Sequence, residues 1–390
     1  MKYYTVFLFL FLSYTSISQP YKKLHEESVV TDSHNDILST CIEKGYHFDD
    51  DLKGKTHSDL GRMKGNVDVQ VFSIWCDGSY KGDSAYKMAT REINTLYAAA
   101  ARNPEKISIT KNLLSIHDAL QQHRIAAMMG VEGGHMINNN LAYLDTFHAL
   151  GVCYMTLTWN NSTSWATSAK EESNGTLQQP KGLNDFGRSV VKKMNELGMM
   201  VDVSHIGEQT FWDVMKVTTK PVIASHSNAY KLCPVPRNLK DSQILAIAKN
   251  GGVIDINFYP GFVDPGYERR DSIFNAKHKA ERDSLLKINP ETYYASNYLA
   301  AKYKDEAQAL RPPLSMLIDH IDYLVKLAGI DHVGLGSDLD GISTTPQGID
   351  DITDYPKITE ELMKRGYSNK DIKKILGENF LRVYYANTGK

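Results

Sequence analysis

Short apolar runs rich in β-branched residues recur along the chain, and each is about as long as a buried β-strand. Continuous apolar runs of this kind are typical of strands that are covered on both faces, as in parallel sheets. We expect strands at residues 29–37, 67–75, 125–131, 153–158, 199–203, 222–225, 253–258 and 333–336.

Most of these runs are followed by a stretch with the periodicity of a helix. Glu92 falls among polar positions of the first such stretch, so we expect it on the solvent side of its helix. Glycines stand between a predicted helix and the next strand at four places, where a left-handed C-cap is common; these are Gly151, Gly198, Gly251 and Gly329. The expected helices cover residues 84–103, 141–150, 185–197, 208–217, 241–250 and 314–328.

The alternation of strands and helices predicts the fold class. Alternating strand–helix units form parallel sheets, and eight of them favour closure into a (β/α)8 TIM-like barrel of the α/β class. No GxGxxG motif follows the first strand, which argues against a dinucleotide site. We predict one domain over residues 19–390, with a helical insertion at 260–313 after the seventh strand. Two interpretations of this insertion stay open: a solvated helical extension, and a lid or oligomer contact.

The N-terminus has the pattern of a signal peptide. Lys2 precedes an apolar run at residues 6–12, and the small residues Ser16 and Ser18 fit cleavage before Gln19. The run is too short to span a bilayer as a helix, and no hydrophobic tail ends the chain. We therefore expect residues 1–18 to be removed and the mature protein to be exported, to a periplasm or outside the cell, with no membrane anchor.

Composition and charge narrow the function classes. The 390 residues are 42% hydrophobic and 23% charged, as in a globular protein with a large core. The net charge is −2, which predicts no nucleic-acid partner and no anionic membrane partner. The four cysteines could pair in an exported protein. We weigh a Cys76–Cys153 disulfide against buried free thiols, and the spacing does not decide between them.

Residues that bind metals follow the first predicted strand. Asp32, His34 and Asp36 alternate there, so their side chains point to one face. At the carboxyl end of a barrel strand that face is the mouth of the barrel, where active sites lie. A histidine and a carboxylate two residues apart can offer a nitrogen and an oxygen to zinc. A polar strand end that caps the next helix is the alternative.

Other strand ends add further ligand types. Glu132 stands among Gly130, Gly133 and Gly134, which allow close approach of another group and suit a carboxylate that bridges two metals. His205 and His226 follow two consecutive strands, each after a serine, and Asp338 follows the last strand. Each residue alone could be structural, but their coincidence at five strand ends favours a dinuclear metal site.

These motifs together resemble the membrane (renal) dipeptidase family, a branch of the metal-dependent amidohydrolase-like barrels. The resemblance rests on DSHNDI, GVEGGH, DVSH, SHSNAY, GLGSDLDG and GENFLRV, and it extends from about Val29 to Asn387. It implies an exported zinc-dependent dipeptidase with two zinc ions (Zn²⁺) per chain. His34 and Asp36 would hold one ion, and Glu132 would bridge both. His205 and His226 would hold the second.

The resemblance also implies a mechanism and a substrate. A metal-bridging hydroxide would attack the peptide bond of a dipeptide, Asp338 would accept its proton, and Arg237 would bind the terminal carboxylate of the substrate. A homodimer is compatible with this family. Two alternatives remain: a related amidohydrolase that acts on an N-acyl amino acid or a lactone, and a metal-binding homologue without catalysis.

Some positions depart from the family pattern. Trp159 stands where the best-known members have a histidine that contacts the substrate carbonyl, and we expect Trp159 and Asn160 to contact the substrate. Two interpretations stay open: Asn160 or Asn161 supplies the missing donor, or the chain uses a different substrate or is slower. Phe262 replaces a substrate-binding tyrosine after the INFY motif, and we expect Tyr259, the last residue of that motif, to contact the substrate. The metal site is therefore better defined by the sequence than the substrate pocket.

Overall fold

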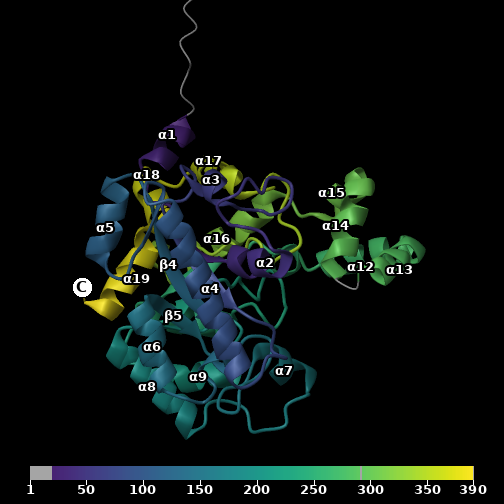
Figure 1. Ribbon diagram of the computed structural model, residues 1–390. Coiled ribbons are helices and arrows are strands. Elements are labelled where there is room, and N and C mark those ends of the chain that lie inside the picture. Colours follow the sequence, from purple (N-terminus) through teal and green to yellow (C-terminus); the bar gives the residue numbers. More distant parts are fainter. Residues whose placement is uncertain (1–19, 290–291, 390) are drawn as a thin grey trace, which may run out of the picture.

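The computed structural model describes residues 20–289 and 292–389, which form a nearly closed barrel of parallel strands surrounded by helices (Figure 1). Within these residues the barrel order is β1-β2-β4-β5-β6-β7-β8-β9, and the short β3 pairs with β4 outside it. This confirms the predicted TIM-like α/β barrel. The strands are β1 (Thr31–Asn35), β2 (Val69–Trp75), β3 (Ile107–Ile109), β4 (Ile125–Glu132), β5 (Val152–Thr156), β6 (Met200–Asp202), β7 (Ile223–Ala224), β8 (Val253–Ile256) and β9 (Val333–Leu335).

The barrel closes just beyond β1 and β9. The Asp338 N–H donates to the His34 carbonyl at 3.0 Å, and the Asp36 N–H donates to the Leu339 carbonyl at 2.9 Å. Because the closing bonds involve the predicted site residues themselves, the first and last strands hold His34, Asp36 and Asp338 together.

The barrel helices follow the predicted pattern closely. Those between β1 and β8 are α2 (Ile37–Lys44), α3 (Leu60–Met63), α4 (Asp83–Arg102), α5 (Leu113–Gln121), the 3-10 turn η1 (Gly134–Ile137), α6 (Ala142–Leu150), α7 (Ala169–Asn174), α8 (Asp185–Leu197), α9 (Glu208–Val217) and α10 (Asp241–Asn250). The others are α1 (Pro20–Glu26), α16 (Leu314–Ala328), η2 (Ile330–His332), η3 (Ile352–Asp354), α17 (Tyr355–Lys364), α18 (Asn369–Lys373), the π-helical η4 (Lys374–Glu378) and α19 (Asn379–Thr388).

Local predictions differ from the structure at a few places. Gly151, Gly198 and Gly251 are left-handed C-caps, as expected. Gly329 also has a positive φ, of 93°, but its ψ of 159° leads the chain into an extended path, so the predicted left-handed cap there is wrong. The predicted first strand was too long at its end, because Ile37 already begins α2.

Glu92 and the cysteines correct two further expectations. Glu92 is fully buried in α4 and does not face solvent, because its Oε2 accepts a hydrogen bond from the Trp75 N–H at the end of β2. All four cysteines are buried free thiols, so the Cys76–Cys153 disulfide is wrong. Both of these cysteines pack in the apolar core instead.

The segment at 260–313 contains the short helices α11 (Pro260–Val263), α12 (Tyr267–Lys277), α13 (Lys279–Ile288), α14 (Thr292–Lys302) and α15 (Lys304–Leu310). Helices α12 to α15 project from one side of the barrel (green in Figure 1). They enclose a small apolar cluster of their own, formed by Phe274, Leu285, Ala295 and Leu299. The segment is therefore held together partly by contacts that do not involve the barrel.

Two findings concern the ends of the chain and the membrane. The predicted signal peptide, residues 1–18, lies outside the described residues. Among the helices that the structure does describe, none is both long enough and apolar enough to cross a membrane.

Candidate active site

A cavity of about 820 Å³ opens at the carboxyl ends of the barrel strands. The sequence-predicted residues Asp36, Glu132, His205 and Asp338 line it, and so do all the predicted substrate contacts, Arg237, Trp159, Asn160 and Tyr259. His34 and His226 are fully buried at its base. The structure thus brings together the predicted metal ligands, Asp338 and the predicted substrate contacts, whereas Asp32 is buried within the barrel.

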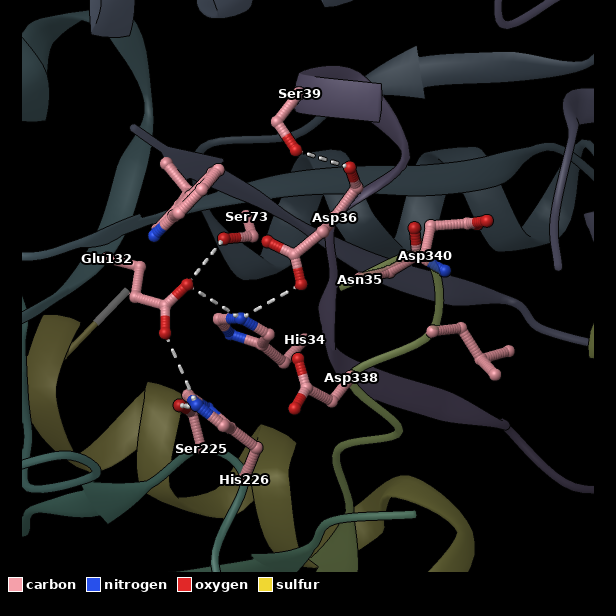
Figure 2. A network of polar contacts seen from close by, with 12 residues as sticks. His34, Asn35, Asp36, Ser39, Ser73, Glu132, Ser225, His226, Asp338 and Asp340 are labelled. Atoms are coloured by element: carbon pink, nitrogen blue, oxygen red, sulfur yellow. Dashed lines mark hydrogen bonds and ion pairs between the residues drawn. The ribbon is translucent and has the colours of Figure 1, made fainter. Parts of the chain in front are cut away.

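Glu132 lies at the centre of this arrangement, and its two carboxylate oxygens face different histidines. Oε2 lies 3.3 Å from Nε2 of His34, whereas Oε1 lies 2.8 Å from Nε2 of His205 and 3.4 Å from Nε2 of His226. Figure 2 shows the contacts of Glu132 with His34 and His226, whose rings stack with their centroids 3.9 Å apart. A carboxylate that directs one oxygen to each side is suited to bridge two cations.

The orientation of His34 follows from a chain of hydrogen bonds behind it. The Tyr154 hydroxyl donates to the Ser33 carbonyl at 2.9 Å, so it accepts from Nδ1 of His34 at 2.8 Å. This arrangement directs Nε2 at the carboxylates of Asp36 and Glu132. A side chain at Gly130 would collide with the Tyr154 ring, with 2.0 Å between its Cβ and the ring, which explains the glycine before Glu132.

His226 is oriented by a second relay, which ends on Asp202. The Ser225 hydroxyl donates to Asp202 Oδ2 at 2.7 Å and accepts from Nδ1 of His226 at 2.7 Å. Asp202 also accepts from the backbone N–H groups of Ser204 and Ser225, both at 3.0 Å, and from Thr156 Oγ1 at 2.5 Å. Metal-binding histidines commonly have such a partner on the second nitrogen. Sequence reasoning missed Asp202, although it lies inside the DVSH motif.

His205 and His226 face each other with their Nε2 atoms 2.9 Å apart, next to the same oxygen of Glu132. His205 has a positive φ of 62°, an unusual backbone conformation that brings its ring into the cavity. Burial, reinforced by the charge of Arg237, lowers the pKa of His205 to about 4. Burial and the charge of His34 also lower the pKa of His226 well below its usual value. Both rings are therefore neutral and carry ligand lone pairs at neutral pH.

The carboxylates have the opposite effect on His34. Burial disfavours its charged form, but Tyr154, Asp36 and Glu132 together raise the pKa of His34 well above its usual value. Burial likewise opposes ionisation of Glu132, yet His34 and His205 hold the pKa of Glu132 well below its usual range. The site therefore stabilises positive charge beside an ionised bridging carboxylate, which is the electrostatic requirement for binding a cation.

Two overlapping groups of ligand atoms are close enough to hold metal ions. One consists of His34, Glu132 and His226, the other of His34, Asp36 and Asp338, and within each group the ligand atoms lie within 4.8 Å of one another. Nε2 of His34 is buried and has no hydrogen-bond partner in the described part of the chain. The described residues therefore fit a metal centre, with Nε2 of His34 common to both groups.

Asp36 and Asp338 complete the second group (Figure 2). Asp36 precedes α2 but makes no capping bond to it, so the helix-cap alternative does not account for this side chain. Asp338 has a positive φ of 63°, and its Oδ2 accepts a hydrogen bond from the Asn257 side chain at 2.8 Å. A Cβ at Gly341 would lie 2.2 Å from Asp36 Oδ2, so only glycine leaves room for both carboxylates.

Asp338 is half-buried and lines the cavity, whereas Asp32 is completely buried, and the two residues differ in role. Burial and the neighbouring Asp36 raise the pKa of Asp338 well above its usual value, which favours proton uptake by this carboxyl. Asp32 instead accepts from the Ser337 N–H and hydroxyl, both at 2.8 Å, and from Gln70 at 3.1 Å. Asp32 therefore links β1 to its neighbours on both sides and is structural.

Arg237 follows β7 and lines the same cavity. Its Nη2 donates to the His226 carbonyl at 3.2 Å, and its guanidinium lies 5.3 Å from the centre of the Phe262 ring. Its Nε is buried without a partner among the described residues. Burial lowers the pKa of Arg237, although an arginine keeps its charge throughout the physiological range. A fixed guanidinium with an unused donor is suited to bind a carboxylate.

The remaining predicted substrate contacts lie on the cavity wall. The hydroxyl of Tyr259 donates to Glu268 of α12 at 2.9 Å, so its ring, rather than its hydroxyl, is available to a ligand. Trp159 packs edge-on against Trp75, with ring centroids 5.1 Å apart. Asn160 also lines the cavity. The side chain of Asn161 packs closely over Gly78, where an added Cβ would collide with it. Trp75 was missed as a site residue because it looks like the last residue of an apolar strand.

Comparisons with known proteins agree with this geometry. Residues 18–388 match the family model described as membrane dipeptidase, peptidase family M19. An uncharacterized dipeptidase of Schizosaccharomyces pombe is 31% identical over 94% of this chain and 82% of its own length. The probable dipeptidase PvdM of Pseudomonas aeruginosa shares 25% identity, with a TM-score of 0.77 over 95% of this chain and 98% of its own.

A further solved structure extends the similarity of fold. It is a metallopeptidase from Rhodobacter sphaeroides, solved with a phosphinate mimic of the dipeptide L-Ala-D-Ala. It is 22% identical, with a TM-score of 0.75, and the match covers 92% of this chain and 99% of that one. At this identity the comparison establishes the shared barrel.

Proposed function

The chain belongs to the membrane dipeptidase family and is a metallo-dipeptidase, and from this premise we propose that it uses two zinc ions to hydrolyse dipeptides. The observation that carries the proposal is the placement of Glu132, whose two oxygens face His34 on one side and the pair His205 and His226 on the other. A nitrogen-rich and carboxylate-rich ligand set of this kind favours zinc.

Each ligand has a defined place in this proposal. His34 and Asp36 would hold one ion, His205 and His226 would hold the other, and Glu132 would contribute a ligand to both. Two bound zinc ions supply a water of lowered pKa and a polarised substrate carbonyl. The chain contributes the fixed directions of the ligands, since Tyr154 and Ser225 each occupy the second nitrogen of one histidine.

The remaining polar residues handle the proton and the substrate. Asn257 holds Oδ2 of Asp338, which leaves Oδ1 to accept a proton from the attacking water and to return it to the departing amine. Arg237 binds the carboxylate at the C-terminal end of the substrate. Fixing both the carboxylate of the substrate, at Arg237, and its scissile carbonyl, at the metal centre, favours dipeptides over longer chains.

The test is turnover of a dipeptide panel by purified, zinc-loaded protein, with D-residues included at the C-terminal side. Hydrolysis of dipeptides, and little hydrolysis of the same compounds with an amidated C-terminus, is the expected result. Hydrolysis of N-acyl amino acids or lactones without turnover of any dipeptide would favour the amidohydrolase alternative. Metal binding without turnover of any of these compounds would favour the homologue that lacks catalysis.

We also propose that the protein is exported after removal of residues 1–18. The pattern Lys2, apolar residues 6–12 and small residues at 16 and 18 supports this. Mass spectrometry of the protein from its native host should give a mature N-terminus at Gln19 in an extracytoplasmic fraction. An intact N-terminus in the cytoplasmic fraction would contradict the proposal.

A further inference from the structure

An aromatic surface lies directly beside the bridging carboxylate. Trp75 is the last residue of β2 and pairs in register with Glu132 at the end of β4. A Cβ at Gly133 would lie 3.4 Å from Cβ of Trp159, so Trp159 packs over the residue that follows Glu132. Both indoles line the cavity and contact each other edge-on, with an interplanar angle of 68°. We refer to Trp75 and Trp159 as the tryptophan wall.

A buried residue of the surrounding helix layer fixes the backbone of Trp75. Glu92 of α4 accepts a hydrogen bond from the Trp75 N–H at 2.7 Å, and its own side chain is completely buried. The indole nitrogen of Trp75 is buried without a hydrogen-bond partner in the described residues. The wall therefore presents ring surface, not an available polar group, at the position of Trp75.

The strand order places the tryptophan wall across the cavity from Arg237. Trp75 ends β2 and Trp159 follows β5, and these two strands flank β4. Arg237 follows β7, and its neighbour Phe262 follows β8. In an eight-stranded barrel these two pairs of strands are on opposite sides. Glu132 and the histidines that face it lie between them. A substrate with its carboxylate at Arg237 therefore extends across the metal ligands toward the indoles.

We propose that the tryptophan wall binds the side chain of the substrate's N-terminal residue, so that the enzyme selects dipeptides that begin with an aromatic or large aliphatic residue. This rests on the proposed function, because Arg237 must take the substrate's carboxylate. Two edge-to-face indoles offer a large apolar surface at low entropic cost, and aromatic contacts of this kind exceed simple area burial. Phe262 cannot serve equally, since it lies against the Arg237 guanidinium.

The experiment compares three dipeptides, Phe-Ala, Ala-Ala and Ala-Phe, with zinc-loaded protein. The wild type should give a kcat/KM for Phe-Ala about tenfold above that for Ala-Ala, mainly through a lower KM. Ala-Phe should gain less than about threefold, because the wall faces only the N-terminal residue. Equal kcat/KM values for Phe-Ala and Ala-Ala, or a larger gain for Ala-Phe, would overturn the proposal while leaving a working dipeptidase.

Substitutions at the two tryptophans test whether they cause the preference for Phe-Ala. Trp159→Ala should reduce the Phe-Ala preference to about twofold, whereas Trp159→Phe, which keeps a ring, should retain most of it. Trp212→Phe is the matched control, since Trp212 lies on α9 and packs against Phe211, away from the cavity. A Phe-Ala preference that survives in both Trp159→Ala and Trp75→Ala would contradict the wall. Thermal melts of each variant confirm that the fold is intact.

A binding measurement separates failure of this inference from failure of the proposed function. If zinc-loaded protein hydrolyses none of the dipeptides, the proposed function is wrong, and calorimetry with metal-stripped protein then tests the wall alone. About tenfold tighter binding of Phe-Ala than of Ala-Phe supports the wall, and a loss of that difference in Trp159→Ala assigns it to the indole. Equal binding of the two peptides overturns it.

Discussion

The metal-binding side of the cavity and its substrate-binding side differ in how the chain builds them. His34 and His226 are completely buried at strand ends, and buried tyrosine and serine hydroxyls fix their rings. Arg237 and Trp159, by contrast, are partly exposed and stand in the loops that follow β7 and β5. The ligand set is thus fixed by the barrel itself, whereas the substrate side depends on loops, in which sequences can change without disturbing the barrel.

The largest effect should come from breaking the metal side at its centre. Glu132→Gln removes the charge that faces all three histidines, and catalytic groups that act as a unit lose most of the rate when one member is removed. We expect dipeptide turnover to fall by about a thousandfold or more, with loss of bound zinc by elemental analysis. Near-normal hydrolysis by this variant would contradict the bridging role.

A smaller loss of zinc affinity should follow a change at a residue that orients a ligand without itself facing the metal site. Asp202→Asn weakens the relay through Ser225 that directs His226, and such partners are worth about 10- to 100-fold in metal affinity. Zinc affinity measured with a competing chelator should fall by this factor. Asp255→Asn is the matched control, because Asp255 is a buried barrel carboxylate whose oxygens have no hydrogen-bond partner among the described residues. Equal losses in both variants would assign the effect to general barrel damage.

On the substrate side, the expected loss concerns binding rather than metal content. Arg237→Lys removes the planar donors that match a carboxylate, so KM for a dipeptide should rise about tenfold with zinc content unchanged. Amidation of the substrate's C-terminus should cost the wild type about as much and cost the variant little. If amidation costs both enzymes equally, Arg237 does not contact that carboxylate.

The smallest effect concerns the stability of the fold and the buried Glu92, which accepts a hydrogen bond from the Trp75 backbone. Burial raises the pKa of Glu92 well above its usual value. A raised folded-state pKa means that the folded protein binds the proton more tightly, so this group costs stability as the pH rises above the ordinary carboxyl pKa. Glu92→Gln, which keeps an acceptor for Trp75, should therefore raise the melting temperature by a few degrees at pH 8 and by less at pH 5.

The exposed Glu105→Gln is the control for that measurement. It should leave the melting temperature nearly unchanged at both pH values, since surface substitutions away from special features have small effects. A Glu92→Gln variant that is destabilised at pH 8 would show that its hydrogen bond to Trp75 matters more than the cost of burying the carboxyl.

The same contrast explains how much of the molecule the sequence could predict. Residues at strand ends obey the alternation of side chains and the geometry of the barrel, so His34, Glu132, His205, His226 and Asp338 could be placed in one cavity from local patterns alone. The short β3 was missed, since three residues that pair only with the first part of β4 give little periodic signal.

The errors have a common physical cause, which is contact between segments far apart in sequence. Glu92 looks like a surface residue of an amphipathic helix. Its burial is explained only by the Trp75 backbone N–H, which donates a hydrogen bond to its carboxyl group. Asp202 looks like one more strand residue until Ser225 of the next strand connects it to His226.

The most direct test of the binuclear dipeptidase is a zinc titration of metal-stripped protein, with dipeptide hydrolysis and bound metal measured at each point. Because Glu132 faces a ligand group on each side, activity should reach its maximum only when two zinc ions are bound per chain. Full activity with one ion bound, or hydrolysis that persists after complete removal of metal, would contradict the account.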